Sequence, residues 1–471
     1  MKVQEAYSRQ DVGPGSVFLV RTMRLSASSY VKIGQHLRVG VALLLIGAST
    51  ALAGQTTGST GSIRSGATSE SSQYQPQAEP ALERLLPKYA QELDSATAAL
   101  GKIPADPLFE TDPIGIFTRT TDASVRWLEG SARLRFGATY TFLNQYATVV
   151  PDTARRHDQL SGRLDFSGNW AVYDNERTAG SIGLLVRSGT NIGMSQQWNL
   201  SDQMGSGIFL NCLQGGGAQR PITVNILYWR QDFLEKRLSF YVGKIHPNQY
   251  ISLSFYNNDE RTQFLNGEND GNLAIASDGT YAGGGAVDFQ ITHHLYVHAL
   301  AIDTVGSQQS NIRTLVDKKY LEAVEFGWFA GAPGTRYFHL RGTVWRDDTK
   351  NLGSGHGAGI GFDREFSSGW APFGRYGFAT ETGTAIRQTD TLGLTNVRPF
   401  GRRGDMFGAA FNYIQPTRTG KRHESLFETF YRIRVTKSME IGPDVQVSIH
   451  PMYAAKSYTS VLLNARMRII F

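Results

Sequence analysis

The end of the chain alternates between apolar and polar side chains, residue by residue. Over residues 458–471 one set of alternate positions is apolar, and the intervening set contains Asn464, Arg466 and Arg468. A period of two places the two sets on opposite faces of a β-strand. One apolar face, one charged face and a final aromatic residue, Phe471, are typical of the closing strand of a membrane barrel. A two-faced strand in a soluble β-sandwich is the alternative.

The same alternation recurs from residue 132 onward. Leu134 and Phe136, for example, alternate with Arg133 and Arg135. The pattern predicts about sixteen strands: 132–146, 157–172, 178–193, 222–232, 238–245, 281–291, 295–304, 318–330, 335–346, 355–364, 371–381, 386–397, 405–415, 424–435, 441–450 and 459–471. The segment 386–397 fits least well because Thr and Asp interrupt it. The predicted fold class is all-β, a transmembrane antiparallel β-barrel of about 16 strands, with a short N-terminal helical segment.

The connections between these strands differ in length on the two sides of the predicted barrel. If the last strand runs down to the periplasm, the long connections 194–221, 246–280 and 305–317 all fall on the outer side, and short ones such as 292–294 fall on the inner side. Outer-membrane barrels show this asymmetry. A sixteen-stranded barrel is too wide for its side chains to fill, so it leaves an aqueous channel. We expect the third outer loop, 246–280, to fold into the lumen and narrow it.

The N-terminal region lies outside this pattern. An apolar run at 39–47 follows Lys32 and Arg38 and precedes a small-residue cleavage site at 51–53, which predicts a signal peptide over residues 1–53. The region that follows, 54–125, is predicted to be periplasmic linker with one short helix.

The predicted helix rests on apolar residues spaced three and four apart between Leu86 and Leu100, with Pro87 near its start and Gly101 at its end. The stretch 102–125 is predicted to be linker because it contains Pro and Asp. The barrel domain is predicted to occupy residues 126–471.

Composition excludes some classes of function. The first 53 residues carry six Lys/Arg and two Asp/Glu, which leaves 41 basic and 39 acidic residues in the rest of the chain. This near-neutral balance is unlike that of a nucleic-acid-binding protein. The single cysteine, Cys212, cannot form a disulfide within the chain. No nucleophile-and-base motif is present, and we expect neither enzymatic activity nor a cofactor nor a metal.

Five short motifs occur in order in the second half of the chain. They are Gly243-Lys244-Ile245-x-Pro247, Asn258-Asp259-Glu260-x-x-Gln263-Phe264-Leu265-Asn266, Arg398-Pro399-x-Gly401-Arg402-x-x-Asp405, Glu428-x-x-Tyr431-Arg432-Ile433-x-Val435-Thr436 and Pro443-Asp444-Val445-Gln446. With these motifs the chain resembles the carbohydrate-selective porins of Gram-negative outer membranes, the OprB-type family, over roughly residues 130–471. The resemblance implies a sixteen-stranded sugar channel with a constriction loop, located in the outer membrane.

Charged residues of both signs fall on the predicted lumen face. They are Arg133, Arg135, Arg163, Arg187, Arg230, Arg432, Arg434, Asp165, Glu325 and Glu428. Paired donors and acceptors suit sugar hydroxyls while leaving little net potential for ions. The residues predicted to contact substrate at the constriction are Arg135, Arg163, Asp165, Glu428, Asp259 and Glu260. The alternative is that these are ordinary lumen charges that pair with one another.

Aromatic residues of the predicted strands are expected near strand ends or on the lipid-facing side, as a girdle at the membrane interface. They are Trp170, Trp229, Trp328, Trp345, Tyr376 and Tyr431.

The pattern is compatible with more than one function. A passive channel for small sugars such as glucose is the main prediction, and a general or anion-favouring diffusion porin of the same fold is the first alternative. An outer-membrane barrel enzyme and a structural barrel are the others. Expected partners are small carbohydrates, outer-membrane lipid and the barrel-assembly machinery, which would engage the C-terminal Phe471. The sugar itself and the choice between monomer and homo-oligomer stay open.

Overall fold

The computed structural model describes residues 106–471 except for 152–153, 155, 196–197, 214–221, 276–280, 305–317, 333–335, 350–352, 381–383 and 419. The predicted signal peptide, the predicted helix near residues 86–100 and the predicted outer loop 305–317 lie outside the described residues.

Sixteen strands form in the described part of the chain, as predicted. They are β1 (Leu134–Ala147), β2 (Asp158–Asp174), β3 (Ala179–Asn191), β4 (Thr223–Phe233), β5 (Leu238–Ile245), β6 (Ala282–Gln290), β7 (Leu295–Asp303), β8 (Tyr320–Ala332), β9 (Arg336–Thr349), β10 (Gly353–Glu365), β11 (Trp370–Ala379), β12 (Ile386–Asn396), β13 (Met406–Pro416), β14 (Glu424–Arg434), β15 (Met439–Ile449) and β16 (Thr459–Ile470). Each lies within a few residues of its predicted range, including β12, the segment that fitted the alternation least well.

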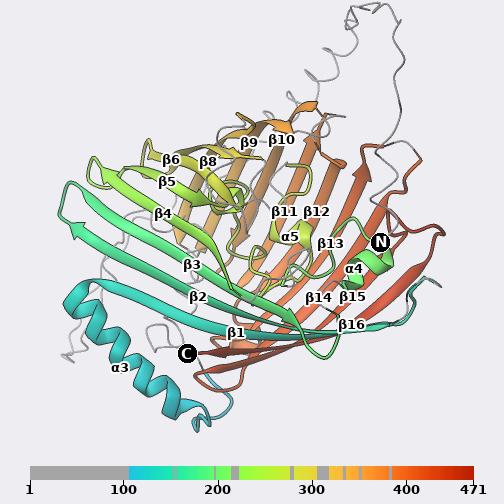
Figure 1. Ribbon diagram of the computed structural model, residues 1–471, viewed down its shortest axis with the longest axis horizontal. Helices are drawn as coiled ribbons and strands as arrows, with labels where there is room; N and C mark the ends of the chain where they lie inside the picture. The colour runs from blue at the N-terminus through green and yellow to red at the C-terminus, as the bar shows by residue number, and fades with distance from the viewer. Residues whose placement is uncertain are drawn as a thin grey trace, which may run out of the picture. The chain divides into compact units, whose positions relative to one another are not determined.

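The strands form one closed antiparallel barrel in which each strand pairs with its neighbours in sequence (Figure 1). The barrel closes where β1 pairs with β16, in a register that places Thr139 opposite Ile470. At the chain end the Phe471 backbone N–H donates to the Ala138 carbonyl at 2.9 Å. Closure leaves no sheet edge unpaired. A β-structure inside a lipid bilayer requires this, because no water is present there to bind free backbone groups. The predicted fold class is therefore confirmed.

The two ends of the barrel differ as the sequence predicted. One end, called the turn end below, carries short connections such as 234–237 and 291–294. The other, the loop end, carries the long connections 192–222 and 246–281. By the general rule for outer-membrane barrels the turn end is periplasmic and the loop end extracellular.

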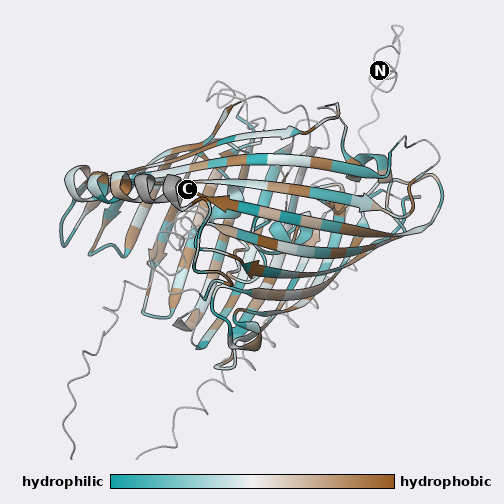
Figure 2. Ribbon diagram, turned by 90° about the horizontal axis from the view of Figure 1, so that it is seen from below, coloured by the Kyte–Doolittle hydropathy of each residue, from teal (hydrophilic) through white to brown (hydrophobic). Residues whose placement is uncertain are grey.

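Side chains alternate between the outer face and the lumen along each strand, and Figure 2 shows the corresponding change of hydropathy from residue to residue. On β16, Leu463 is 52% exposed on the outer face, whereas Arg466 and Arg468 are buried inside. An Arg at the lipid face near the bilayer midplane costs about 2–4 kcal/mol, so charge concentrates on the lumen side.

The wall departs from simple alternation on β4, and one predicted girdle residue is not on its outer face. The register between β3 and β4 shifts between Leu185 and Val186, which marks an irregularity of the β-bulge type. The extra residue reverses the inside–outside parity beyond it, so that Val224 faces outward while Ile226 and Tyr228 are buried inside. Trp345, predicted for the outer girdle, is also buried, in a cluster with Ile275 of the third loop.

The segment before the barrel differs from the predicted linker. Residues Gly115–Ala132 form the helix α3, which packs beside β1 and ends at Arg133 in a left-handed conformation (φ 54°). The sequence did not predict α3 because its apolar residues are sparse: among its side chains that the structure describes, Val125 is buried and Trp127 is 69% exposed.

The chain reaches α3 along the turn end of the barrel. The Leu108 and Phe109 backbone N–H groups donate to the carbonyls of Arg434 and Val435 at 3.0 and 2.9 Å. Asp106 accepts a hydrogen bond from the Arg403 backbone N–H at 3.1 Å. These contacts attach residues 106–109 to the turns that follow β12 and β14. No helix within the described residues is long and apolar enough to cross a membrane.

Candidate functional site

The third outer loop connects β5 and β6, and its residues 246–275 lie inside the barrel (Figure 1). It contains one turn of 3-10 helix, Pro247–Gln249, and the short helix α5, Gly267–Asp270. Nearly all of its described residues are buried. Asn side chains hold its backbone: Asn258 accepts from the Ser254 N–H at 2.9 Å, and Asn266 caps α5 by accepting from the Asn269 N–H at 3.0 Å.

One contact between the loop and the wall consists of ion pairs. Arg163 on β2 lies 2.9 Å from Asp165 and 2.7 Å from Glu260 of the loop. Arg187 on β3 lies 2.7 Å from the same Asp165 and 3.7 Å from Glu260. All four side chains are at most 9% exposed. Two arginines and two carboxylates thus form one buried, charge-balanced cluster, called the β2 anchor below.

On another part of the wall the loop is bound by a single arginine, Arg375 on β11. Its guanidinium donates to the Glu268 carbonyl at 2.7 Å, the Ser252 carbonyl at 3.1 Å and the Asn258 side chain at 2.8 Å. It also donates to the Gly271 carbonyl. These acceptors are backbone carbonyls and a side-chain amide, so dipoles and not a paired carboxylate satisfy the hydrogen bonds of the guanidinium group. We call this contact the β11 anchor.

Glu428 on β14 provides a third attachment. Its carboxylate accepts hydrogen bonds from the Leu265 backbone N–H and, at 2.8 Å, from the Asn266 amide of the loop. The Gln446 amide on β15 donates to it at 2.8 Å. The sequence singled out Glu428, and the structure places it against the loop.

Asp259 belongs to the loop's internal framework, and Glu268 joins the loop to Thr391 on β12. Asp259 pairs with Arg261 at 2.9 Å and accepts from the Thr262 hydroxyl at 2.7 Å. Burial disfavours the charged carboxylate, but the Arg261 guanidinium outweighs burial and holds the pKa of Asp259 below its usual value. Glu268 accepts from the Leu273 N–H at 2.9 Å and the Thr391 hydroxyl at 3.0 Å, and burial raises its pKa to about 7.

Arg135 does not join the other predicted site residues. Its guanidinium pairs with Glu129 of α3 at 2.7 Å, and its side chain is 55% exposed. Arg135 precedes the part of β1 that pairs with β16, near the turn end, whereas Arg163 lies farther along the wall beside the loop. The parity of the strand was predicted correctly, but parity alone does not give depth along the barrel axis.

The second outer loop, between β3 and β4, also enters the lumen, which the sequence did not predict. Its helix α4, Leu200–Met204, is capped by Asn199. Glu424 on β14 accepts from the Gly207 backbone N–H at 2.7 Å. The Cys212 backbone N–H donates to the Leu265 carbonyl of the third loop at 2.9 Å.

Several arginines that hold the loops were not among the predicted site residues. Arg466 on β16 donates to the carbonyls of Glu260 and Gln263 at 2.8 and 2.7 Å. Arg341 on β9 acts through Asp363 on β10, which it pairs with at 2.6 Å and which accepts from the Ser254 hydroxyl of the third loop at 2.7 Å. Both lie on the lumen parity of their strands, and so does Arg375. The signal that finds all three is an arginine in mid-strand, which the lipid face excludes.

Comparison with known proteins supports the porin class that the sequence predicted. Residues 346–471 match the family described as carbohydrate-selective porin, OprB family. The porin AaxA of Chlamydia caviae is 25% identical over 305 residues, which cover 60% of this chain and 64% of that protein. The porin AaxA of Chlamydia abortus is 24% identical over 248 residues, or 49% of this chain and 54% of that protein. The matches thus span less than two thirds of these relatives' length.

A solved structure shares the fold. The high-pH structure of Pseudomonas putida OprB superposes with a TM-score of 0.61 at 14% identity and covers 78% of this chain and 99% of its own. The fold is therefore that of a porin, a closed sixteen-stranded β-barrel of the outer-membrane class. The resemblance to the carbohydrate-selective porin family of the OprB type is confirmed, and the matched region contains the motifs at Arg398, Glu428 and Pro443.

Proposed function

We propose that this chain is an outer-membrane channel for the passive diffusion of small neutral sugars such as glucose, and that its third outer loop narrows the lumen. The observation that supports this most directly is the loop's attachment across the interior: Glu260 is bound at β2, and Glu268 and its neighbours are bound at β11. A loop held on several sides of a wide barrel leaves only a restricted passage.

Charge balance supports selectivity for neutral solutes. At the β2 anchor, Arg163 and Arg187 are matched by Asp165 and Glu260. Paired charges provide donors and acceptors for sugar hydroxyls but produce little net potential, so an ion gains less than it would in a ring of one charge. In this proposal Arg163, Asp165, Glu260 and Glu428 line or support the passage, and Asp259 holds the loop's shape. Arg135 has no place at the constriction.

One observation favours a second candidate, a general or anion-favouring porin of the same fold. Arg375 and Arg466 donate to carbonyl oxygens of the loop. Dipoles, and not a paired carboxylate, accept these hydrogen bonds, so less of the positive charge is cancelled than at the β2 anchor. An excess of such arginines would attract anions. The porin fold and the family resemblance favour either channel over a barrel enzyme.

The test is liposome swelling. The folded protein, without its predicted signal peptide, is reconstituted into liposomes. Swelling is measured in isosmotic glucose, in longer glucosides and in a gluconate salt, with empty liposomes as the control. Fast entry of glucose and slow entry of gluconate are expected. Faster entry of gluconate would favour the anion porin, and equal rates for all small solutes would identify a general porin. The barrel is shown to be folded by its electrophoretic mobility in an unheated sample. If such a folded barrel gives no swelling, the channel function is overturned.

A further inference from the structure

A groove on the outer wall has no role in the proposed channel. It has a volume of about 620 Å³ and lies across β6, β7, β8 and β9. Small side chains make its floor, among them Gly285, Ala299 and Ala301. Many other positions of the outer face carry large apolar side chains, such as Leu227, which is 48% exposed.

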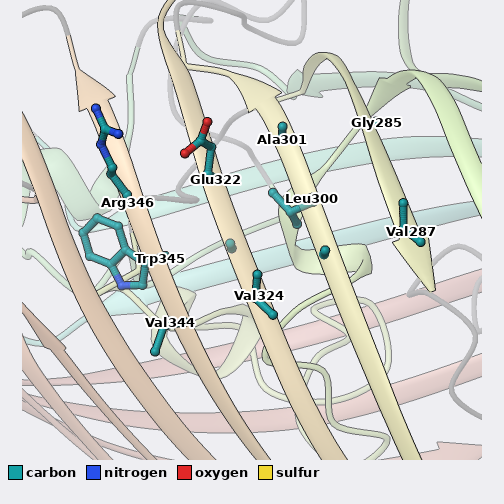
Figure 3. Close-up of a pocket in the computed structure, with 11 residues that line it drawn as sticks. Gly285, Val287, Leu300, Ala301, Glu322, Val324, Val344, Trp345 and Arg346 are labelled. Atoms are coloured by element: carbon teal, nitrogen blue, oxygen red, sulfur yellow. The ribbon is translucent and has the colours of Figure 1, made fainter. Parts of the chain in front are cut away.

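Strand pairing arranges the outward side chains of this region in three rows. The row nearest the loop end runs Gly285, Ala301, Glu322 and Arg346; the next runs Val287, Ala299, Val324 and Val344; the third runs Phe289, Val297, Phe326 and Gly342. Glu322 and Arg346 therefore sit side by side at one end of the groove, with Val324 and Val344 below them (Figure 3). The exposed rings of Phe289 and Phe326 stand beyond the other end.

The first row marks a change of environment. Arg346 is 62% exposed and lies 3.2 Å from Asp348, the next outward residue toward the loop end. Charged side chains on the outer face of a barrel are costly in the hydrocarbon and nearly free at the interface. The row of Glu322 and Arg346 thus lies where hydrocarbon gives way to head groups. The groove begins at that level and extends into the apolar layer.

We propose that this groove binds one acyl chain of a phosphorylated glycolipid of the outer leaflet. The acyl chain packs against Ala299 and Ala301, and the phosphate group binds Arg346. A guanidinium suits phosphate because it offers several N–H donors in one plane. The carboxylates of Glu322 and Asp348 accept hydrogen bonds from hydroxyl and amide groups of the sugar. A head group with both phosphate and sugar matches this mixture of charges better than a phosphate alone.

The inference rests on the outer-membrane location that accompanies the proposed function. The test uses the folded chain in detergent and measures lipid retained by native mass spectrometry. The probes are hexa-acylated lipid A, the same lipid without phosphates, and phosphatidylglycerol. We expect one lipid A to stay bound per barrel, with weaker retention of the other two. Glucose swelling of the same samples reports separately on the channel.

Substitutions separate the two halves of the groove. Ala301→Phe should reduce retention of lipid A at least tenfold because the ring fills the space of the acyl chain. Arg346→Gln should weaken it about fivefold, the typical effect of one basic residue at a membrane surface. The dephosphorylated lipid should be insensitive to Arg346→Gln. Ala409→Phe, on the outer face of β13, and Arg364→Gln, near the turn end of β10, are matched controls that should change nothing.

Three outcomes would overturn the proposal. They are retention of lipid A by Ala301→Phe, equal retention of lipid A with and without phosphates, and a wild-type dimer that Ala301→Phe makes monomeric, which would assign the groove to a second copy of the chain. If Ala301→Phe does not fold, Ala299→Leu provides the same test. A variant that loses the lipid yet swells in glucose like the wild type would support the groove as a site distinct from the channel.

Discussion

The third loop is attached to opposite kinds of partner at its two main anchors. At the β2 anchor, Arg163 and Arg187 share the carboxylates of Asp165 and Glu260. At the β11 anchor, Arg375 alone donates to several carbonyl and amide oxygens. The first arrangement is redundant, because each carboxylate has two guanidinium groups within 4 Å. The second depends on one side chain.

The difference shows how a loop can be held while the charge of the passage is set separately. Ion pairs hold the loop and cancel charge, whereas an arginine bound to dipoles holds the loop and leaves its charge uncancelled. In the proposed channel, the β2 anchor favours neutral solutes and the β11 anchor adds positive potential. The following substitutions test this division.

The largest effect is expected for Arg375→Met. It removes the β11 anchor and leaves several buried loop carbonyls without a donor, so the free energy of loop opening should fall by about 4 kcal/mol. Hydrogen exchange of the loop amides measures that opening, and liposome swelling in longer glucosides should become faster. Arg375→Lys keeps the charge but not the planar, forked set of donors. Its loop-opening free energy should lie between those of the wild type and Arg375→Met. If hydrogen exchange of the loop amides is unchanged in Arg375→Met, the β11 anchor does not hold the loop.

A smaller effect is expected for Arg163→Gln. Breaking a buried ion pair usually costs about 3–5 kcal/mol, and the nearby Arg187 should keep the loss at about 3 kcal/mol. Hydrogen exchange near Glu260 is the measurement, together with the ratio of glucose to gluconate entry, which should rise because the cluster becomes negative overall and repels the gluconate anion. Arg230→Gln is the control, because its 2.7 Å pair with Asp232 lies within β4. An equal effect in both variants would contradict a special role of the β2 anchor.

Loop docking should also depend on pH through Glu268. Its pKa is raised from 4.5 to about 7 in the docked loop, so the undocked loop binds fewer protons between these values. Docking is then strongest below pH 4.5, weakens as the pH rises to about 7, and stays constant above. From pH 5 to pH 8 the loss is about 2 kcal/mol. Hydrogen exchange of the loop amides at pH 5 and pH 8, corrected for the intrinsic exchange rate, should show this loss. Glu268→Gln should abolish the difference between the two pH values.

The smallest effect is expected for Arg135→Gln. The pair with Glu129 is exposed, and such pairs contribute about 0–1 kcal/mol. Glucose and gluconate entry should equal those of the wild type, in contrast to Arg163→Gln. A change in sugar entry as large as that of Arg163→Gln would return Arg135 to the constriction.

The strand pattern was predictable because burial in lipid imposes a strict chemical rule on alternate positions. It located β1 to β16 within a few residues, even at β12, where Thr389 and Thr391 face the lumen. It failed at Ile226 and Tyr228, which are buried inside although apolar, because a bulge changes parity without any change in composition. It also missed α3, whose sparse apolar side chains give no helical stripe.

The candidate site was predictable only in part. Parity and charge selected Arg163, Asp165 and Glu428, and the length of the third loop pointed to Glu260. The pairing of Arg163 with Glu260, 97 residues away, depends on how far the loop reaches and where it turns. Asn258 and Asn266 set those turns through hydrogen bonds that no periodicity reveals. Arg135 was placed in the site because strand parity does not give depth.

By itself, then, the sequence determined the barrel, its strand number, the two faces of its wall and its two kinds of end. These follow from local alternation and from connection length, which membrane burial and strand pairing constrain at every residue. Only the tertiary structure decided which lumen charges meet, that the second loop also enters the lumen, and that small residues on four neighbouring strands make a groove. These features join residues far apart in the chain, and closure of the barrel brings them together.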